Sequence, residues 1–513
     1  MTPGSPGPDR AGAVAGPRAL PARVDVAVVG TGFAGIGMAI RLRRAGREDF
    51  VVLERADDLG GTWRDNSYPG AACDIPSHLY SFSFALNPNW SRAYSPQPEI
   101  QRYLRTCVDR FGLGRHLYFG HEVLEATWDE VSSRWTVRTP GGELTCRVLV
   151  WASGPLSQPV LPDVEGLDRF AGRWFHTAAW DHDYDLTDKS VAVVGTGASA
   201  IQVVPAIQPL VRRLTVYQRN APWVVPRRDH PIPPARQRLL GRLPVVQRLG
   251  RAWMYWTREL VVPVLMNTSP ARRARAEALA RAHLDRQVPD PALLAALTPT
   301  YQMGCKRILI SDDYYPALAR PGVELVSAPV TGLGPHSVRD ADGGEREVDA
   351  VIFATGFAAA EPAFATRLRG RGGRCLADAW AQGMEAYLGT TVSGFPNLFV
   401  LVGPNTVLGH NSMVFIIESQ LNYVMDFLAY AARHGEPTAE VRAKVETRYN
   451  RQLQARLATS VWNTGGCASW YLDHRGHNTT LWPGYTVTFR RRTRRFRPGD
   501  YVLTAPGEPA GAL

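Results

Sequence analysis

Lysine is scarce in this 513-residue chain: it accounts for only three of the 58 basic residues, so 55 are arginine. The formal net charge of +11 would suit a nucleic-acid or membrane partner. An excess of positive charge that comes almost entirely from arginine, in a chain rich in alanine, glycine and proline, is instead typical of a GC-rich genome. No RNA- or DNA-binding motif accompanies the arginine run at 490–497. We therefore expect no nucleic-acid partner, and a solvated strand face or tail at that run.

Paired cysteines and long apolar segments are also missing. No CxxC pair and no metal-ligand cluster occurs, which excludes a zinc ribbon and a local redox dithiol and predicts reduced thiols and no metal. The cysteines are Cys73, Cys107, Cys146, Cys305, Cys375 and Cys467. No run of ~18 apolar residues exists, so no stable membrane insertion is expected. Residues 1–23 lack the apolar stretch of a signal peptide, which predicts a disordered tail on a cytoplasmic protein.

What is present is an internal repeat, because VAVVGTG occurs at 26–32 and again at 191–197. Each copy is a β-branched run that leads into a glycine turn and an apolar-periodic stretch, which predicts strand, turn and helix. Both copies match G-x-G-x-x-G/A, in which small residues permit a tight turn, close approach of a pyrophosphate and helix–strand packing. The matching residues are Gly30, Gly32 and Gly35, then Gly195, Gly197 and Ala200.

A charged residue follows each glycine motif at the same spacing. Glu54 lies 19 residues after Gly35, and Arg219 lies 19 residues after Ala200. An acid at this position suits the ribose 2′-hydroxyl of FAD or NAD, whereas a cation suits a 2′-phosphate. The second site is therefore predicted to bind NADPH.

Two further predicted strands, at 148–151 and 351–353, end in related turns and mark where the chain leaves one nucleotide domain and returns to it. The predicted fold class is α/β with two Rossmann-like domains. A discontinuous FAD domain, residues 24–158 and 385–513, would flank an inserted NADPH domain, residues 159–384.

Residues 231–300 are rich in arginine, leucine and alanine at helical spacing. We expect them to form a helical subdomain inside the insertion. The amphipathic stretch 253–266 is expected to be buried against its neighbours rather than to lie on a membrane.

Two longer motifs separate the classes of two-nucleotide flavoproteins, since fold alone does not give the reaction. Their residues are Phe170, Gly172, His176, Trp180 and Asp181 in the first, and Gly60, Gly61, Trp63, Tyr68, Pro69, Gly70 and Asp74 in the second. The first motif resembles the fingerprint FxGxxxHxxxW(P/D) of type I Baeyer–Villiger monooxygenases, and the second resembles their pattern [A/G]GxWxxxx[F/Y]P[G/M]xxxD. Every fixed position is filled, and the resemblance covers roughly residues 24 to 490.

The resemblance implies a reaction and a set of residues. Members of this family bind FAD and NADPH, consume O2 and convert a ketone to an ester or lactone through a C4a-peroxyflavin and a tetrahedral peroxy adduct. On this pattern Arg307 lies beside the flavin and Asp74 pairs with it. Lys306 would join Arg219 on the NADPH 2′-phosphate.

Other residues take expected roles from the same resemblance. Thr62 and Trp63 are expected to contact cofactor, Asn405 to lie in a loop that approaches the isoalloxazine, and Trp470 to reach the nicotinamide or substrate. His176 is expected near the linkers between the domains, where it couples NADPH binding to catalysis rather than touching substrate. A monomer or homodimer is expected.

Two other classes remain as alternatives. A flavin-containing monooxygenase would oxygenate sulfides or amines, although such enzymes usually carry Tyr or Phe where this chain has Trp180. A nucleotide-binding regulator that has lost catalysis would not need the complete motifs. The missing CxxC argues against the disulfide reductases, and the identity of the ketone is not readable from any motif.

Overall fold

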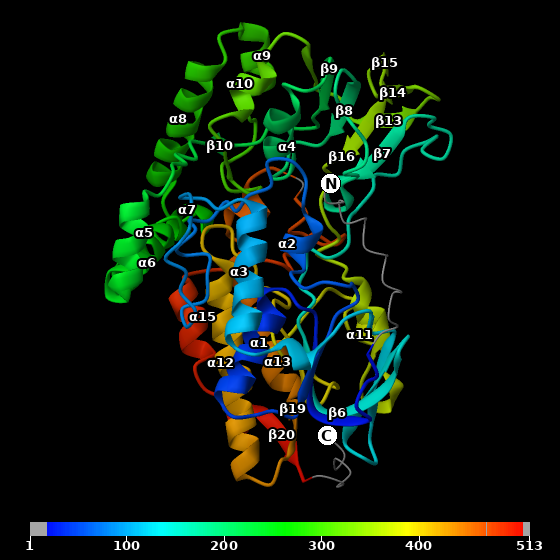
Figure 1. The fold of residues 1–513 in the computed structure, drawn as a ribbon, viewed down its shortest axis with the longest axis vertical. Coiled ribbons are helices and arrows are strands. Elements are labelled where there is room, and N and C mark those ends of the chain that lie inside the picture. Colours follow the sequence, from blue (N-terminus) through cyan, green and yellow to red (C-terminus); the bar gives the residue numbers. More distant parts are fainter. Residues whose placement is uncertain (1–17, 468, 506–513) are drawn as a thin grey trace, which may run out of the picture.

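The computed structural model describes residues 18–467 and 469–505, and its lower half in Figure 1 is built on an eight-stranded sheet. The strand order is β17-β4-β5-β6-β1-β2-β3, with β18 also paired to β6. The central pairs are parallel, and β1 is buried through its apolar run, as a strand covered on both faces must be. The strands are β1 (Arg23–Val29), β2 (Phe50–Leu53), β3 (Leu117–Tyr118), β4 (Glu125–Asp129), β5 (Arg134–Thr139), β6 (Gly142–Trp151), β17 (Leu368–Arg369) and β18 (Leu398–Val400).

A second, five-stranded parallel sheet forms the upper half, in the order β12-β9-β8-β16-β7. The repeated heptapeptide therefore supplies β1 of the first sheet and β8 of the second. The predicted α/β class with two Rossmann-like modules is confirmed. The strands are β7 (Arg173–His176), β8 (Ser190–Val194), β9 (Arg213–Tyr217), β12 (Val323–Val326) and β16 (Ala350–Phe353).

Three small sheets complete the strand set. An antiparallel three-stranded sheet packs near the second sheet, a parallel pair lies below it, and an antiparallel pair closes the C-terminal end. Their strands are β13 (Val330–Leu333), β14 (Ser337–Asp340) and β15 (Glu345–Glu347), then β10 (Val224–Val225) and β11 (Leu309–Ile310), then β19 (Thr438–Val441) and β20 (Tyr501–Thr504).

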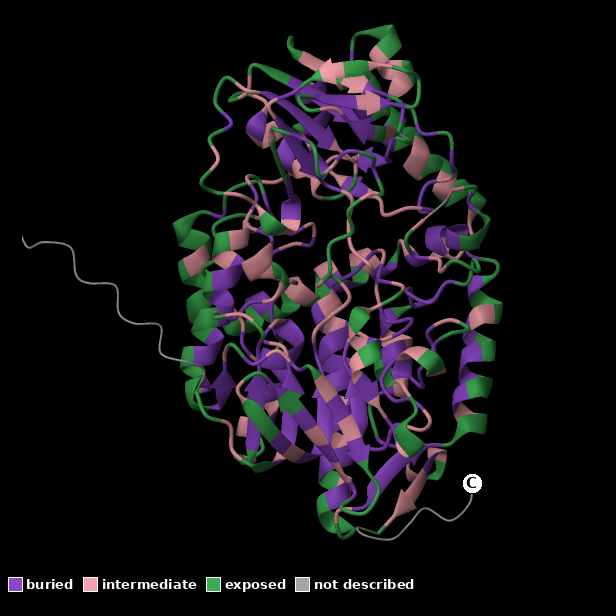
Figure 2. Ribbon diagram, turned by 90° about the vertical axis from the view of Figure 1, so that its right-hand side faces the viewer, coloured by how far each residue is buried: buried purple, intermediate pink, exposed green. Residues whose placement is uncertain are grey.

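Helices cover both sheets, and burial is concentrated in the strands and the inner helix faces (Figure 2). Helices α1 and α12 contact each other on the first sheet, where they share one apolar core. The helices at the first sheet include α1 (Phe33–Arg44), α2 (Thr62–Asp65), α3 (Gln97–Arg110), α11 (Leu376–Ala379), α12 (Met413–Arg433), α13 (Ala443–Leu457), α14 (Val461–Thr464) and α15 (Thr486–Arg492). Helices α4 (Ala200–Ile207) and α10 (Tyr314–Leu318) belong to the second.

The chain returns to the first sheet earlier than the predicted residue 385. Strand β17 already pairs with β4, and Leu376 and Trp380 lie in the core of the first sheet. This return could not be predicted, because a two-residue strand is too short to show a hydrophobic period. The border between the modules lies upstream of the predicted one.

The segment 231–300 is helical, as predicted, and forms α5 (Pro234–Arg242), α6 (Pro244–Glu259), α7 (Val262–Leu265), α8 (Pro270–Gln287) and α9 (Pro291–Ala296). Burial of its amphipathic stretch is only partly as predicted. Helix α7 is buried, but Trp253 and Trp256 of α6 are 70% and 55% exposed. The prediction was wrong for the outer face of α6 because hydrophobic periodicity identifies an apolar face without saying what covers it.

Both ends of the described chain are more ordered than predicted. Residue Arg18 donates a hydrogen bond of 2.7 Å to the carbonyl of Arg115, and its own carbonyl accepts one of 2.9 Å from His121. The predicted tail therefore cannot extend to residue 23, and residues 1–17 lie outside the described residues. The arginine run begins in helix α15, with Thr486 and Phe489 buried, rather than on a strand or in a tail.

Candidate active site

The first glycine turn connects β1 to α1. Gly30 has φ 102°, and a Cβ there would lie 2.9 Å from the carbonyl oxygen of Ala152. A Cβ at Gly35 would overlap the carbonyl oxygen of Gly30 itself. Gly32 stands at the N-cap of α1 with no side-chain cap. The turn thus leaves the first amides of α1 open to an anion, which fits the pyrophosphate of a dinucleotide.

Glu54 lies directly after β2, beside this turn, and is 5% exposed. One carboxylate oxygen accepts hydrogen bonds from the amide and the hydroxyl of Thr31, at 3.0 and 2.6 Å. The other lies 3.0 Å from a guanidinium nitrogen of Arg64. Sequence reasoning placed the acid but missed these two partners, although Thr31 stands between the first two motif glycines. They orient the carboxylate at the edge where a ribose would lie.

The second glycine turn connects β8 to α4. Gly195 has φ 117°, and a Cβ there would lie 2.6 Å from the carbonyl oxygen of Ala354. Gly197 is exposed, and no atom lies within 4 Å of the place its Cβ would take. Ala200 is fully buried as the first residue of α4. The space in front of α4 is therefore open to a second dinucleotide.

Two cations meet beyond β9. Arg219 is exposed, and the ammonium of Lys306 donates a 3.0 Å hydrogen bond to Asn220. Burial, and then the charge of Arg219, lower the pKa of Lys306. Neither cation forms an ion pair with an acid among the residues that the structure describes. Two like charges held together in this way favour a dianion, as the sequence predicts for a 2′-phosphate.

Replacing Arg219 with alanine is expected to raise the KM for NADPH about 10- to 100-fold, since hydrogen bonds to charged groups contribute about 1.5–3 kcal/mol. The KM for NADH and the turnover at saturation should change little. Steady-state kinetics with both nucleotides measure this. The control is Arg213→Ala, which removes an exposed arginine at the opposite end of the same strand. An unchanged NADPH preference would contradict the assignment.

Arg307 and Asp74 form an ion pair between the two modules. The arginine, just before β11, places two guanidinium nitrogens 2.8 and 2.6 Å from one oxygen of Asp74. A third nitrogen donates to the carbonyl of Leu408 at 3.4 Å. The charge of Asp74 raises the pKa of Arg307. The hydrogen bonds hold the guanidinium in place. The side chains of Arg307 and Asp74 are 27% and 28% exposed, so the pair remains accessible from solvent.

The C-terminal segment lies against this pair. Tyr471 is 1% exposed, and its hydroxyl has no hydrogen-bond partner among the described residues. Burial raises the pKa of Tyr471 to about 12, against the opposing charge of Arg307. Its ring lies 4.5 Å from that of Trp470, which is 42% exposed. Sequence reasoning assigned a role to Trp470 only, whereas Tyr471 is the aromatic residue beside Arg307.

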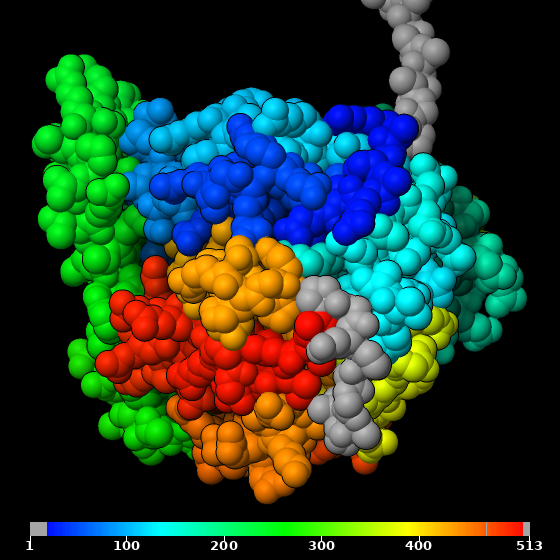
Figure 3. Space-filling view, turned by 90° about the horizontal axis from the view of Figure 1, so that it is seen from below, coloured from blue at the N-terminus to red at the C-terminus, as the bar shows by residue number. Residues whose placement is uncertain are grey.

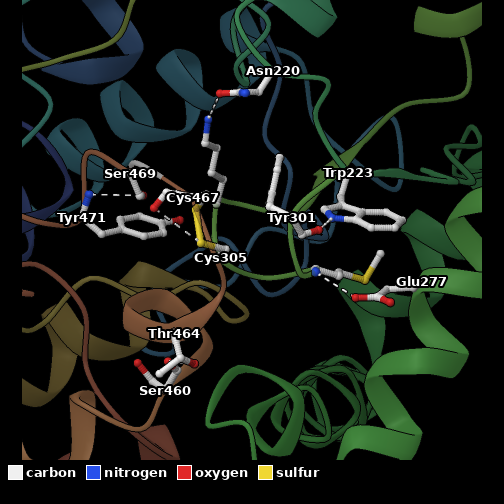
Figure 4. The surroundings of a disulfide bond; sticks show 12 residues. Asn220, Trp223, Glu277, Tyr301, Cys305, Ser460, Thr464, Cys467, Ser469 and Tyr471 are labelled. Carbon is white, nitrogen blue, oxygen red and sulfur yellow. Dashed lines mark hydrogen bonds between the residues drawn. A yellow bond between two sulfur atoms is a disulfide. The ribbon is translucent and has the colours of Figure 1, made fainter. Parts of the chain in front are cut away.

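A disulfide between Cys305 and Cys467 joins this C-terminal segment to the residue before Lys306 (Figure 4). The prediction that all six thiols are reduced was therefore wrong for two of them. The two cysteines are 162 residues apart and meet because the segment before Lys306 packs on the end of α14, where the Gln302 amide donates to the Gly465 carbonyl at 3.0 Å. Spacing rules detect local pairs and cannot detect this one.

Thiol counting tests the disulfide. Alkylation of the unfolded protein without reductant is expected to add four groups per chain, at Cys73, Cys107, Cys146 and Cys375, and prior reduction should raise the number to six. Intact mass measures both. In Cys467→Ser, five groups should be added with or without reductant. Six groups on the unreduced wild-type chain would contradict the disulfide.

Comparison with known proteins decides the family. Residues 27–240 match the family model of the pyridine nucleotide-disulphide oxidoreductases. A Baeyer–Villiger monooxygenase of Streptomyces coelicolor is 50% identical over 484 residues, which cover 94% of this chain and 93% of that protein. Another, of Pseudomonas aeruginosa, is 48% identical over 490 residues, covering 95% and 92%. The chain belongs to the Baeyer–Villiger monooxygenase family.

Solved structures agree in fold over about 95% of the chain. Cyclohexanone monooxygenase from Rhodococcus sp. Phi1, bound to NADP+, is 28% identical, with a TM-score of 0.84, and covers 95% of this chain and 100% of that one. An oxidized steroid monooxygenase bound to NADP is 33% identical, with a TM-score of 0.82, and covers 94% and 99%.

The Baeyer–Villiger fingerprint lies in the second module, against the linkers. His176 ends β7 and is 4% exposed; its Nδ1 accepts a 3.0 Å hydrogen bond from the amide of Ala178. Burial lowers the pKa of His176 to about 4, so the ring is neutral. Its edge faces Phe357 in the linker after β16, which forms a bridge to Pro159 in the other linker. The histidine therefore supports the crossing between the modules.

The other fingerprint residues hold that strand in place. Gly172 is required because a Cβ would lie 2.5 Å from the carbonyl oxygen of Asp349. Phe170 is buried in the core of the second sheet. The ring of Trp180 packs edge-on against Phe175. Asp181 accepts a 2.6 Å hydrogen bond from Arg173, which lowers the pKa of that carboxyl.

The second Baeyer–Villiger pattern bridges the modules. Tyr68 donates a 2.9 Å hydrogen bond to the side-chain oxygen of Gln202 in α4, and the Gln202 amide donates to the Ala72 carbonyl at 2.9 Å. Trp63 donates to the hydroxyl of Tyr80 at 3.1 Å, whereas Thr62 is exposed at the start of α2. Sequence reasoning missed Gln202, which follows the second glycine motif and ties α4 to the segment that carries Asp74.

The Asn405 side chain lies between two loops. It is 2% exposed, and its amide nitrogen donates to the carbonyls of Asn478 and Leu481 at 2.7 and 3.2 Å. The side chain therefore joins the loop predicted at Asn405 to the segment 478–481. No sequence motif identified these partners.

Proposed function

We propose that the chain is an FAD-dependent, NADPH- and O2-consuming Baeyer–Villiger monooxygenase that converts a small-molecule ketone to an ester or lactone. The observation that carries this proposal is the Arg307–Asp74 pair, held between two nucleotide modules. Bound FAD would supply oxygen activation, and bound NADPH would supply the reducing equivalents.

Each cofactor has a set of residues that fits it. The glycine turn at Gly30, the open start of α1 and Glu54 would hold FAD, because a Cβ at Gly30 or Gly35 would meet backbone atoms and the N-cap Gly32 carries no side chain. The turn at Gly195, the start of α4, Arg219 and Lys306 would hold NADPH. A solved structure of OTEMO in complex with FAD and NADP is similar to this chain, at 27% identity and a TM-score of 0.85.

Arg307 would act on charge rather than on protons. Its guanidinium stays cationic when water is excluded and can stabilise negative charge that develops on oxygen at the reaction centre. Asp74 is a positioning residue, because it orients the guanidinium and offsets the cost of burying it. Tyr471 and the carbonyl of Leu408 limit the directions in which the arginine can move.

A ketone panel with mass analysis of the products tests the function. Consumption of NADPH and O2 with a gain of one oxygen and ester formation is the expected result. Sulfoxide or N-oxide formation together with no ester from any ketone would favour the flavin-containing monooxygenase alternative. No NADPH-dependent O2 uptake by the FAD-loaded protein would favour a non-catalytic regulator.

We further propose that the enzyme works in the cytoplasm as a monomer or homodimer. Within residues 18–467 and 469–505, no helix is both long and apolar enough to cross a bilayer. Size-exclusion chromatography with light scattering measures the subunit number, and fractionation of the source cells measures the location.

A further inference from the structure

Helix α6 exposes its apolar face to solvent. Six large apolar side chains point outward over an arc of about 100°, at the spacing of one helix face. They are Val245 (57% exposed), Val246 (39%), Leu249 (67%), Trp253 (70%), Trp256 (55%) and Leu260 just beyond the helix (63%). A contiguous apolar surface of this kind is rare on a protein that does not use it.

The opposite face of α6 is polar and fixes the rotation of the helix. The Gln247 amide donates to the carbonyl of Asn87 at 2.7 Å, and the hydroxyls of Tyr255 and Thr486 are hydrogen-bonded at 2.8 Å. Glu259, 2% exposed, accepts from the amide and the hydroxyl of Thr486 at 2.9 and 2.7 Å. The apolar face cannot turn inward without breaking these buried hydrogen bonds, which are costly to lose.

Positive charge surrounds the apolar face. Residues 231–276 contain nine arginines and a single acid, the buried Glu259. Four of the arginines are exposed on α5 and α6: Arg236, Arg238, Arg242 and Arg248. Leu239 and Leu243 beside them are each 47% exposed. These residues belong to a ridge along one edge of the molecule, green in Figure 3.

We propose that this surface, the α5–α6 face, docks on a lipid bilayer that contains anionic phospholipids. Exposed tryptophan and leucine can enter the boundary between headgroups and acyl chains, while arginines beside them pair with anionic headgroups. A second copy of the chain fits less well, because a two-fold contact through this face would bring arginines against arginines with no exposed acid in 231–276 to neutralise them. The inference does not depend on the proposed reaction.

Co-sedimentation of the FAD-loaded protein with vesicles tests the docking. Wild type is expected to sediment with mixed phosphatidylcholine–phosphatidylglycerol vesicles, less with phosphatidylcholine alone, and less as salt rises. The triple variant Leu249→Gln/Trp253→Gln/Trp256→Gln should stay in the supernatant. The matched control Leu124→Gln/Val131→Gln/Leu210→Gln, which alters exposed apolar residues elsewhere, should sediment like wild type. Bound FAD and NADPH oxidation show that each variant is folded.

A charge variant tests the headgroup contribution. Arg238→Gln/Arg242→Gln/Arg248→Gln should weaken binding to the anionic vesicles. We expect a loss of roughly five-fold for each arginine removed, because one basic side chain near an anionic surface strengthens binding by about that factor. Wild type that remains in the supernatant, or an apolar triple variant that sediments like wild type, would overturn the proposal. So would light scattering that showed a wild-type dimer converted to a monomer by the apolar triple variant, because the face would then be a contact between copies.

Discussion

Replacing Arg307 with alanine is expected to lower the rate of ester formation about 10²–10³-fold, while FAD stays bound and NADPH is still oxidised. Removing one preorganised donor to a developing negative charge typically costs about 2.7–4 kcal/mol, or about 10²–10³ in rate. The nucleotide sites keep their own residues, because Glu54, Arg219 and the two glycine turns do not contact Arg307. Product formation and NADPH consumption, measured in the same reaction, separate the two effects.

Two further variants sharpen this prediction. Arg307→Lys keeps the charge but cannot place two nitrogens on one carboxylate oxygen, so it should recover only part of the rate. Asp74→Asn should also lower ester formation, and combining it with Arg307→Ala should add little, because the two groups act as one unit. Arg320→Ala, which removes an exposed arginine elsewhere, is the control. Ester formation at the normal rate by Arg307→Ala would contradict the role assigned to the arginine.

Local patterns predicted the strands and turns that carry the proposed nucleotide sites. Glu54 is the first residue after β2 and Arg219 the second residue after β9, the two strands that their apolar runs predicted. Such sites can be found in sequence because a strand, a glycine turn and the residue after the next strand are set by short-range rules. The strands 148–151 and 351–353 were found for the same reason, as β6 and β16.

Long-range packing was not readable from residue chemistry. The contact between Asp74 and Arg307 joins residues 233 positions apart, and only the family resemblance predicted it. The Cys305–Cys467 disulfide and the Gln202 bridge likewise depend on how the modules pack. The rotation of α6 depends on buried partners such as Asn87 and Thr486, which no periodicity can identify.

The third position of the glycine motif is occupied by Gly35 in the first copy and by Ala200 in the second, and the structure distinguishes the two sites where the sequence pattern does not. The pattern accepts glycine or alanine at that place. In the second motif Ala200 is accommodated, fully buried, at the start of α4. In the first motif a methyl group at Gly35 would overlap the carbonyl oxygen of Gly30 and approach a Val28 side-chain carbon at 3.6 Å. The two turns therefore differ in how closely helix and strand approach.

Gly35→Ala is consequently expected to lower FAD affinity about 5- to 160-fold, because the overlap is with backbone and can be relieved only by moving the turn away from the start of α1. Forcing one extra methyl group into a packed site typically costs about 1–3 kcal/mol. FAD content after purification and titration of the apoprotein measure the loss. Ala200→Gly, the reciprocal change in the second motif, should leave FAD content unchanged. Gly114→Ala is the control for glycine substitution itself, because no atom lies within 4 Å of the new Cβ. Full FAD affinity in Gly35→Ala would contradict the close contact between position 35 and the Gly30 carbonyl oxygen.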